Sequence, residues 1–156
     1  MSFAVDVKSW AEKTKGNTDD IISGTCLDLS RRVILRTPVD SGQARWNWQA
    51  SIGSPKSNVL VSTPDEGSTV KAPNPSNAST RRLNQIAGVV EKAPGNIFYL
   101  TNNMPYIDKL EFGGYPSPSP TGKTSGGFST QSPSGMVRIT IREFNQIFNK
   151  QAAKKK

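Results

Sequence analysis

Apolar residues recur at helical spacing twice within the first 36 positions of the chain. The first pattern predicts a helix over residues 6–15, which the Gly16-Asn17 pair should end. The second predicts a helix that Thr18 caps and that ends before Thr37-Pro38, because a residue preceding proline avoids the α region. The apolar positions are Val7, Trp10 and Ala11 in the first pattern and Ile22, Cys26, Leu29 and Val33 in the second.

Strict alternation of apolar and polar residues follows over residues 45–52 and predicts a half-buried strand that carries Trp46 and Trp48 on its apolar face. A second strand is predicted over residues 58–62, between two prolines, and the two strands could pair as a hairpin. A third, short strand is predicted over residues 97–101.

Helical spacing returns in the second half of the chain. Ser79 should cap a helix that ends at residues 93–95, and residues 105–113 should form a single helical turn that Gly113 ends. Residues 137–142 alternate like a strand, but good helix formers follow them, so a C-terminal helix is favoured. The apolar positions of that helix are Val137, Ile141, Phe144 and Phe148.

Three segments are too poor in apolar residues to fold alone. Residues 64–77 and 114–134 are rich in Gly, Ser, Pro, Asn and Thr, and residues 151–156 form a basic tail. We interpret the first two as an arm and a long loop. The pattern predicts one domain over residues 1–156 with an α+β fold, in which two or three helices pack on a small antiparallel sheet.

Composition agrees with a small core, since only 34% of the residues are hydrophobic and the chain holds 13 Gly and 11 Pro. The formal net charge is +8, which suits nucleic acid, an anionic surface or an acidic protein and does not choose among them. No run approaches ~18 apolar residues, so a membrane-spanning segment is not expected.

The sequence lacks the residues that most kinds of catalytic site require. The chain has no His and only Cys26, so the usual zinc sites, a disulfide and His-activated cysteine catalysis are excluded. Gly122-Lys123-Thr124 resembles the end of a phosphate-binding loop but lacks the preceding glycine, strand and helix. A hydrolase would need an Asp, Glu or Ser site, and no such constellation is found. We therefore expect no enzyme, metal or cofactor.

One cluster favours a different class of protein. Arg45 stands beside Trp46 and Trp48, and guanidinium and indole groups can grip phosphates and stack on bases. A nucleic-acid-binding protein is therefore the alternative interpretation, although the shared face of the tryptophans favours packing in the core.

Two segments can set the course of the backbone. Pro38 fixes φ at the helix exit, Asp40 can accept backbone amide hydrogens in the turn, and Gly42 permits a positive φ. Glu111-Phe112-Gly113 can bury an aromatic side chain and turn the chain. Both segments can therefore be purely architectural.

These two segments also carry a resemblance. Thr37-Pro38-Val39-Asp40-Ser41-Gly42-Gln43-Ala44-Arg45 resembles the Thr-Pro-Val-Asp-Thr-Gly-x-x-Arg signature of the tail-completion, or head–tail joining, proteins of long-tailed bacteriophages. The segment from Met104 to Gly113 is similar to their aromatic stretch that ends in Glu-Phe-Gly, here Glu111, Phe112 and Gly113. Ser41, the Lys109-Leu110 pair and a longer Pro-Ser loop depart from the pattern.

The resemblance implies a non-catalytic subunit of the virion neck. Such subunits form a ring, expected to be hexameric, that completes the tail tube and joins it to the head connector, with genomic DNA passing through the lumen without specific binding. The arm and the loop would then reach neighbouring copies. Candidate interface residues are Pro73, Asn74, Tyr106, Tyr115 and Phe128.

Overall fold

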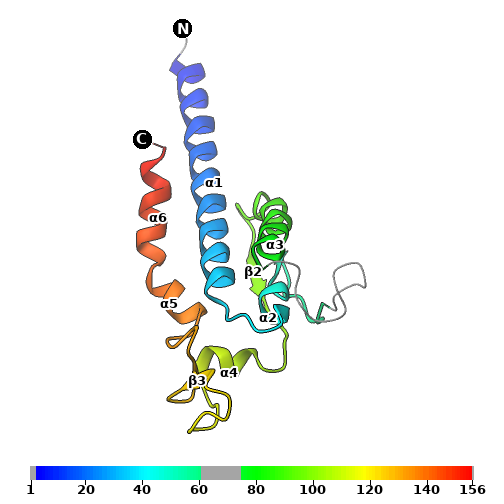
Figure 1. Ribbon diagram of the computed structural model, residues 1–156. Coiled ribbons are helices and arrows are strands. Elements are labelled where there is room, and N and C mark those ends of the chain that lie inside the picture. The colour runs from blue at the N-terminus through cyan, green and yellow to red at the C-terminus, as the bar shows by residue number, and fades with distance from the viewer. Residues whose placement is uncertain (1–2, 61–74, 156) are drawn as a thin grey trace.

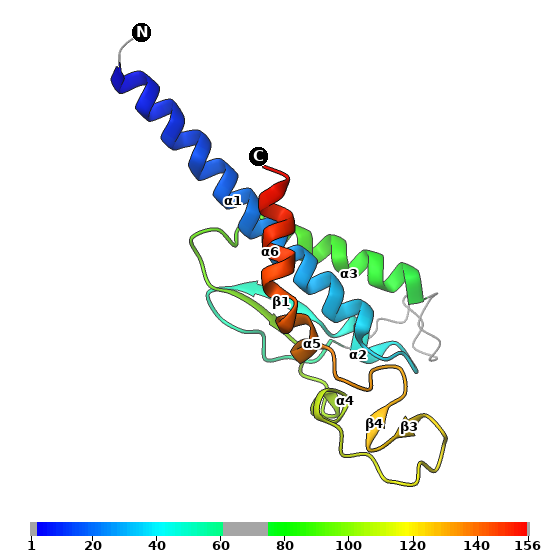
Figure 2. The same ribbon diagram turned by 90° about the vertical axis from the view of Figure 1, so that its left-hand side faces the viewer.

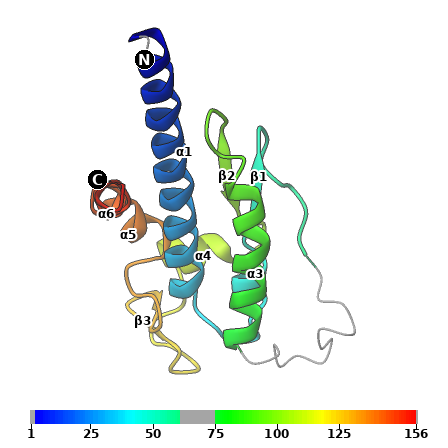
Figure 3. The same ribbon diagram turned by 90° about the horizontal axis from the view of Figure 1, so that it is seen from above.

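The computed structural model describes residues 3–60 and 75–155. These residues form six helices and two small antiparallel pairs of strands, so the fold is α+β. One long helix, α1, stands in the middle, with α5 and α6 on one side and α3 with the larger strand pair on the other (Figure 1, Figure 3). Within the described residues, no helix is both long enough and apolar enough to cross a membrane.

Helix α1 runs without interruption over Phe3–Arg36. The predicted break at Gly16-Asn17 is therefore wrong, as is the predicted cap at Thr18, whose hydroxyl donates to the carbonyl of Thr14 inside the helix. A glycine in a helix weakens it by only about 1 kcal/mol, which the hydrogen bonds of neighbouring turns can offset. The predicted end before Pro38 is confirmed.

The strand predicted over residues 45–52 is shorter than expected. Gln43–Trp46 form a helical turn, α2, and only Gln49–Ile52 form a strand, β1. The amide of Asn47 donates to the carbonyl of Gln43 and holds the turn closed. Trp46 is thus helical, while Trp48 is buried in the core as expected.

Strand β1 pairs with β2, Phe98–Thr101, in an antiparallel register in which Ala50 faces Leu100. The third predicted strand is confirmed. The hairpin between β1 and residues 58–62 is wrong: residues 58–60 form no strand, and residues 61 and 62 lie outside the described residues.

Side-chain amides hold this segment in place of a strand ladder. Asn47 both donates to the carbonyl of Leu60, at 3.2 Å, and accepts from its amide, at 2.6 Å. Gln49 and Asn103 both donate to the carbonyl of Asn58. The backbone polar groups that a strand would have paired are satisfied by these amides instead.

Helix α3 spans Pro75–Val90 and packs on α1. It begins before the cap predicted at Ser79, so residues 75–77 of the predicted arm are helical. The rest of the arm, 64–74, lies outside the described residues together with Pro73 and Asn74.

Helix α4, Ile107–Phe112, ends at Gly113 as predicted, where φ is 83°. The loop over residues 114–134 is confirmed except for a minimal strand pair, β3, Thr124–Ser125, and β4, Phe128–Ser129.

The C-terminal segment is helical, in two parts. Val137–Arg142 form α5 and Phe144–Ala153 form α6, with the junction at Glu143. The face that packs on α1 is formed by Thr140 and Ile147, both buried. Three of the four apolar positions predicted for this helix are exposed: Ile141, Phe144 and Phe148.

The core lies where α1, α3, α4 and the larger strand pair meet. Its fully or nearly buried members come from four helices, α1 to α4, and from two links between elements: Val33, Ile34, Ala44, Trp48, Ile86, Val90, Leu110 and Met136. Helix α1 extends beyond the C-terminal end of α6 (Figure 1, Figure 2), and among its described side chains none before Cys26 packs in this core.

A glycine substitution tests whether α1 is continuous. Gly16 is exposed and a Cβ there would meet no atom within 4 Å, so Gly16→Ala should stabilise the helix by about 0.5–1 kcal/mol. Hydrogen exchange of the amides of residues 14–18 should slow roughly two- to fivefold. The matched control is Gly53→Ala, equally open but at φ 81°, which should destabilise. Faster exchange in Gly16→Ala would mean that the chain turns there.

Candidate functional site

The Thr37 to Arg45 motif closes the C-terminus of α1. The Thr37 hydroxyl donates to the carbonyl of Val33 at 2.8 Å and accepts from the indole nitrogen of Trp48, also at 2.8 Å. Arg45 Nη2 donates to the carbonyls of Leu35, at 3.0 Å, and Thr37, at 2.8 Å. A helix C-terminus leaves its last carbonyls unpaired and carries partial negative charge, so a guanidinium there supplies both donors and charge.

The turn inside the motif follows the expected backbone but not the expected contacts. Gly42 has φ 85°, as predicted. The prediction that Asp40 accepts backbone amides is wrong, because its carboxylate is exposed and pairs with Lys123 Nζ at 2.8 Å. Val39 is held instead by Gln131, whose amide group donates to its carbonyl and accepts from its amide, both at 2.9 Å. The turn is thus fastened to the loop of residues 114–134.

The Glu111 carboxylate starts α5. It is buried and accepts hydrogen bonds from the backbone amides of Met136, Val137 and Arg138 at 2.7–2.9 Å. Arg138 Nε lies 3.2 Å from the same carboxylate, and Arg138 Nη2 donates to the Glu111 carbonyl. Burial raises the pKa of Glu111, but these hydrogen bonds lower it by more, so the pKa lies below its ordinary value.

Glycines make room for this contact. A Cβ on Gly135, which has φ 76°, would lie 2.6 Å from the carbonyl oxygen of Glu111 and 2.7 Å from its carboxylate. A Cβ on Gly113 would lie 3.0 Å from the ring of Phe128. The aromatic residue of the motif behaves differently from the prediction, since Phe112 is exposed and Arg138 covers its ring at 5.1 Å.

The two motifs meet across a groove of about 570 Å³. The turn forms one wall, and Tyr106 with Tyr115 and the loop forms the other. Burial, and then the neighbouring Tyr115 and Asp40, raise the pKa of Tyr106, so its phenol stays protonated near neutral pH. The groove is lined by Pro38, Val39, Asp40, Ser41, Gly42, Ala44, Tyr106, Leu110, Tyr115, Pro116, Pro120, Thr121, Lys123, Thr124, Ser129 and Gln131.

The candidate interface residues that fall on described positions are partly used within the chain. Tyr106, Tyr115 and Phe128 are all half-buried, the first two against the core and Phe128 against Gly113. Whether any of them also contacts a neighbouring copy stays a prediction.

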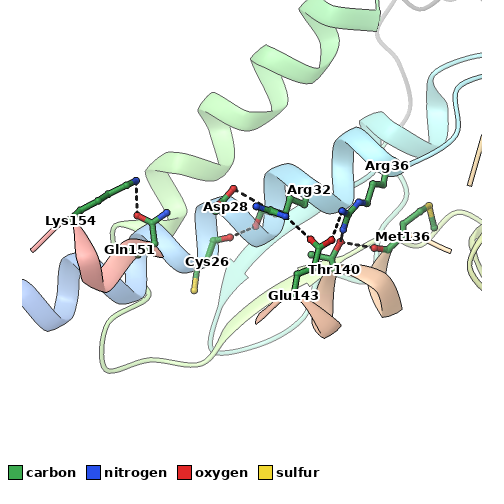
Figure 4. Close-up of polar contacts among 10 residues, drawn as sticks. Cys26, Asp28, Arg32, Arg36, Met136, Thr140, Glu143, Gln151 and Lys154 are labelled. Carbon is green, nitrogen blue, oxygen red and sulfur yellow. Dashed lines mark hydrogen bonds and ion pairs between the residues drawn. The ribbon is translucent and has the colours of Figure 1, made fainter. Parts of the chain in front are cut away.

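A second cluster, which the sequence did not predict, clamps the C-terminal helices to α1 (Figure 4). Glu143 accepts from Arg32 Nη1 at 2.6 Å and from Arg36 Nη2 at 2.7 Å, and Arg36 Nη1 also donates to Thr140 at 3.0 Å. The hydrogen bond from Arg36 and then the contacts with Arg32 lower the pKa of Glu143. Glu143 is the only acidic residue after Glu111. Its isolation among basic residues is the sequence feature that could have indicated this ion-pair cluster.

Closer to the C-terminus, α6 approaches the backbone of α1. A Cβ on Gly24 would lie 2.8 Å from the side-chain oxygen of Gln151, so α6 uses the space that this glycine leaves. The Lys155 ammonium also pairs with Asp20.

The side chains of Arg45, Trp46 and Trp48, predicted as a candidate nucleic-acid cluster, are engaged in contacts within the chain. Arg45 is committed to two backbone carbonyls, and Trp48 is buried with its indole nitrogen bonded to Thr37. The guanidinium of Arg82 lies 4.0 Å from the ring centroid of Trp46. These contacts give all three side chains structural roles.

The described residues contain neither a metal-binding cluster nor a fully exposed cysteine. Across the described residues, no group of three or more His, Cys, Asp or Glu side chains is placed to hold a metal ion. Cys26 is half-buried, and burial raises the pKa of its thiol, which disfavours the nucleophilic thiolate. Of the motif side chains, Thr37, Arg45 and Glu111 bind backbone groups of their own chain.

Removing the charge of Glu111 should be costly. Glu111→Gln places an amide donor against backbone amides that need acceptors, so the free energy of unfolding should fall by about 2–3 kcal/mol. Asp108→Asn, an exposed substitution in the same helix, should change it by less than about 0.5 kcal/mol. Urea denaturation measures both. Equal losses of stability in the two variants would contradict the role of the Glu111 carboxylate at the start of α5.

Stability should decrease in acid because of Glu111 and Glu143. Since their pKa values are lowered in the folded state, their contribution is complete above the ordinary glutamate pKa of about 4.3 and is lost as the pH falls through the lowered values. Urea midpoints measured from pH 7 to pH 3 should decline less steeply in Glu143→Gln than in the wild type. A parallel decline in both proteins would contradict the role of the clamp.

The comparisons with known proteins add no relatives. No family model, no curated protein and no solved structure matches the chain.

Proposed function

We propose that this chain is a structural subunit of a ring at the head–tail junction of a long-tailed bacteriophage, where it completes the tail tube and joins it to the head connector. The observation that carries the proposal is that the two motifs that resemble this family act on chain geometry. Thr37 and Arg45 end α1, and Glu111 begins α5.

The chemistry of the motifs supports a non-catalytic role. Arg45 and Glu111 are the charged side chains that the sequence brought forward most strongly, and both bind backbone groups. A catalytic acid, base or electrostatic stabiliser has to face a substrate instead. The groove beside them is lined mainly by Pro, Tyr and small residues.

The proposed assembly is a closed ring, expected to be hexameric, with genomic DNA passing through its lumen without specific binding. Its partners would be the tail tube protein on one side and the head connector on the other, in the neck of the virion. The loop over residues 114–134 and the arm over residues 64–77 would reach neighbouring subunits and enlarge the contact between them.

A nucleic-acid-binding protein is the second candidate, and one observation favours it. Arg142 and Lys150 are exposed on α5 and α6, where the single carboxylate, Glu143, is already paired with α1. Phosphate contacts through such cations would release counterions and make affinity depend strongly on salt.

Mass measurement separates the two functions. Native mass spectrometry and sedimentation velocity of the full chain, alone and mixed with tail tubes, should give a ring or a cap of several copies on tube ends. A persistent monomer that ignores tubes, and whose affinity for duplex DNA falls steeply between 50 and 200 mM salt, roughly 10³-fold or more, would favour nucleic-acid binding instead.

A further inference from the structure

The outer face of α5 and α6 carries an apolar stripe without a partner in the described chain. Ile141, Phe144 and Phe148 follow at i, i+3 and i+7 and are 63%, 44% and 39% exposed. The two phenyl rings stack with centroids 6.1 Å apart. Ile147, which is about 100° around the helix from Phe148, is fully buried. The apolar surface of α6 therefore extends beyond the part that the chain itself buries.

A second unpartnered element is the N-terminal half of α1. It extends away from the body (Figure 2), residues 11–16 are all exposed, and Val7 is 46% exposed. At 1.5 Å per residue, residues 3–16 project over about 20 Å. Helices this short are marginal in water without tertiary packing, and this one contains the weak helix formers Thr14 and Gly16.

We propose that the N-terminal half of α1 of one copy packs along the outer face of α5 and α6 of the next copy. This inference rests on the proposed ring and names the surfaces that close it. The lengths agree, because α5 and α6 together span residues 137–153, about 25 Å. The sequence supplies apolar residues at positions 7, 10 and 11 of α1 to meet the stripe.

Charge favours this pairing over a symmetric dimer of the stripe. Residues 137–153 carry three cations against Glu143 alone, so two stripes placed face to face would bring together two positively charged surfaces, which is unfavourable. The projecting part of α1 is balanced instead, because residues 3–19 carry three acidic and three basic side chains: Asp6, Glu12, Asp19, Lys8, Lys13 and Lys15. A contact between two different surfaces is heterologous, which is the type that generates rings.

The area of the stripe also requires an extended partner. Its three exposed side chains present roughly 250 Å², if a free aromatic side chain offers about 200 Å². A stable interface takes about 800 Å² from each partner. A helix lying along the whole stripe also contacts the flanks of both helices and so adds area that a small apolar contact cannot supply.

The first test replaces exposed apolar residues in the full-length chain. Phe144→Ser with Phe148→Ser, and separately Val7→Asp, should weaken assembly at least about tenfold in sedimentation velocity. Ile97→Ser is the matched control, an apolar residue that is 64% exposed but lies outside the stripe and outside both motifs, and it should leave assembly unchanged. Circular dichroism confirms that each variant is folded.

A cross-linking test identifies the two surfaces directly. In a Cys26→Ala background, copies carrying Val7→Cys are mixed with copies carrying Ile141→Cys or Phe148→Cys under mild oxidation. Disulfide-linked dimers should form in the mixtures, and neither kind of copy alone should give them. Dimers from Phe148→Cys copies alone would indicate the symmetric contact and overturn the proposal.

The outcomes separate this interface from the proposed function. Rings or tube caps that survive the substitutions and show no mixed disulfide would overturn the interface while leaving the ring intact. If the wild type forms no ring and binds no tube ends, the interface and the proposed function both fail.

Discussion

The buried carboxylate of Glu111 is the contact on which the arrangement of the C-terminal third depends. A carboxylate removed from water must be hydrogen-bonded, and three backbone amides at the start of α5 provide those bonds. Gly135 permits the approach, since any Cβ there would collide with Glu111. Once α5 begins at this point, α6 runs back along α1, where Arg32 and Arg36 hold Glu143.

The same physical problem is solved at the end of α1 with the opposite charge. Backbone amides are unpaired at a helix N-terminus and carbonyls at a C-terminus, so a carboxylate suits the first and a guanidinium the second. Glu111 and Arg45 occupy these positions. The need to pair backbone groups at helix termini therefore explains why each motif contains a charged residue.

The architecture that results has surfaces suited to assembly. The described core lies around the C-terminal half of α1, while Val7 of α1 and the outer face of α5 and α6 expose apolar side chains to solvent. Such exposure is unfavourable in an isolated subunit, and the proposed association would remove it. The clamp at Glu143 matters here because it fixes the direction in which the outer face points.

The sequence by itself determined the elements whose signals are local. The end of α1 before Pro38, the strand over 97–101, the turn at Gly113 and the α+β class all follow from turn chemistry and periodicity. Only the tertiary structure decided the rest. Gly16 does not end α1, because the small cost of a glycine in a helix is offset by the helical hydrogen bonds of the turns before and after it. Strand β1 pairs with β2 across about 50 residues, and the clamp joins Arg32 to Glu143 across 111 positions, so no local pattern could specify either contact. Periodicity placed the apolar residues of α5 and α6 on a face, but which face α1 covers was decided by where Glu111 starts the helix.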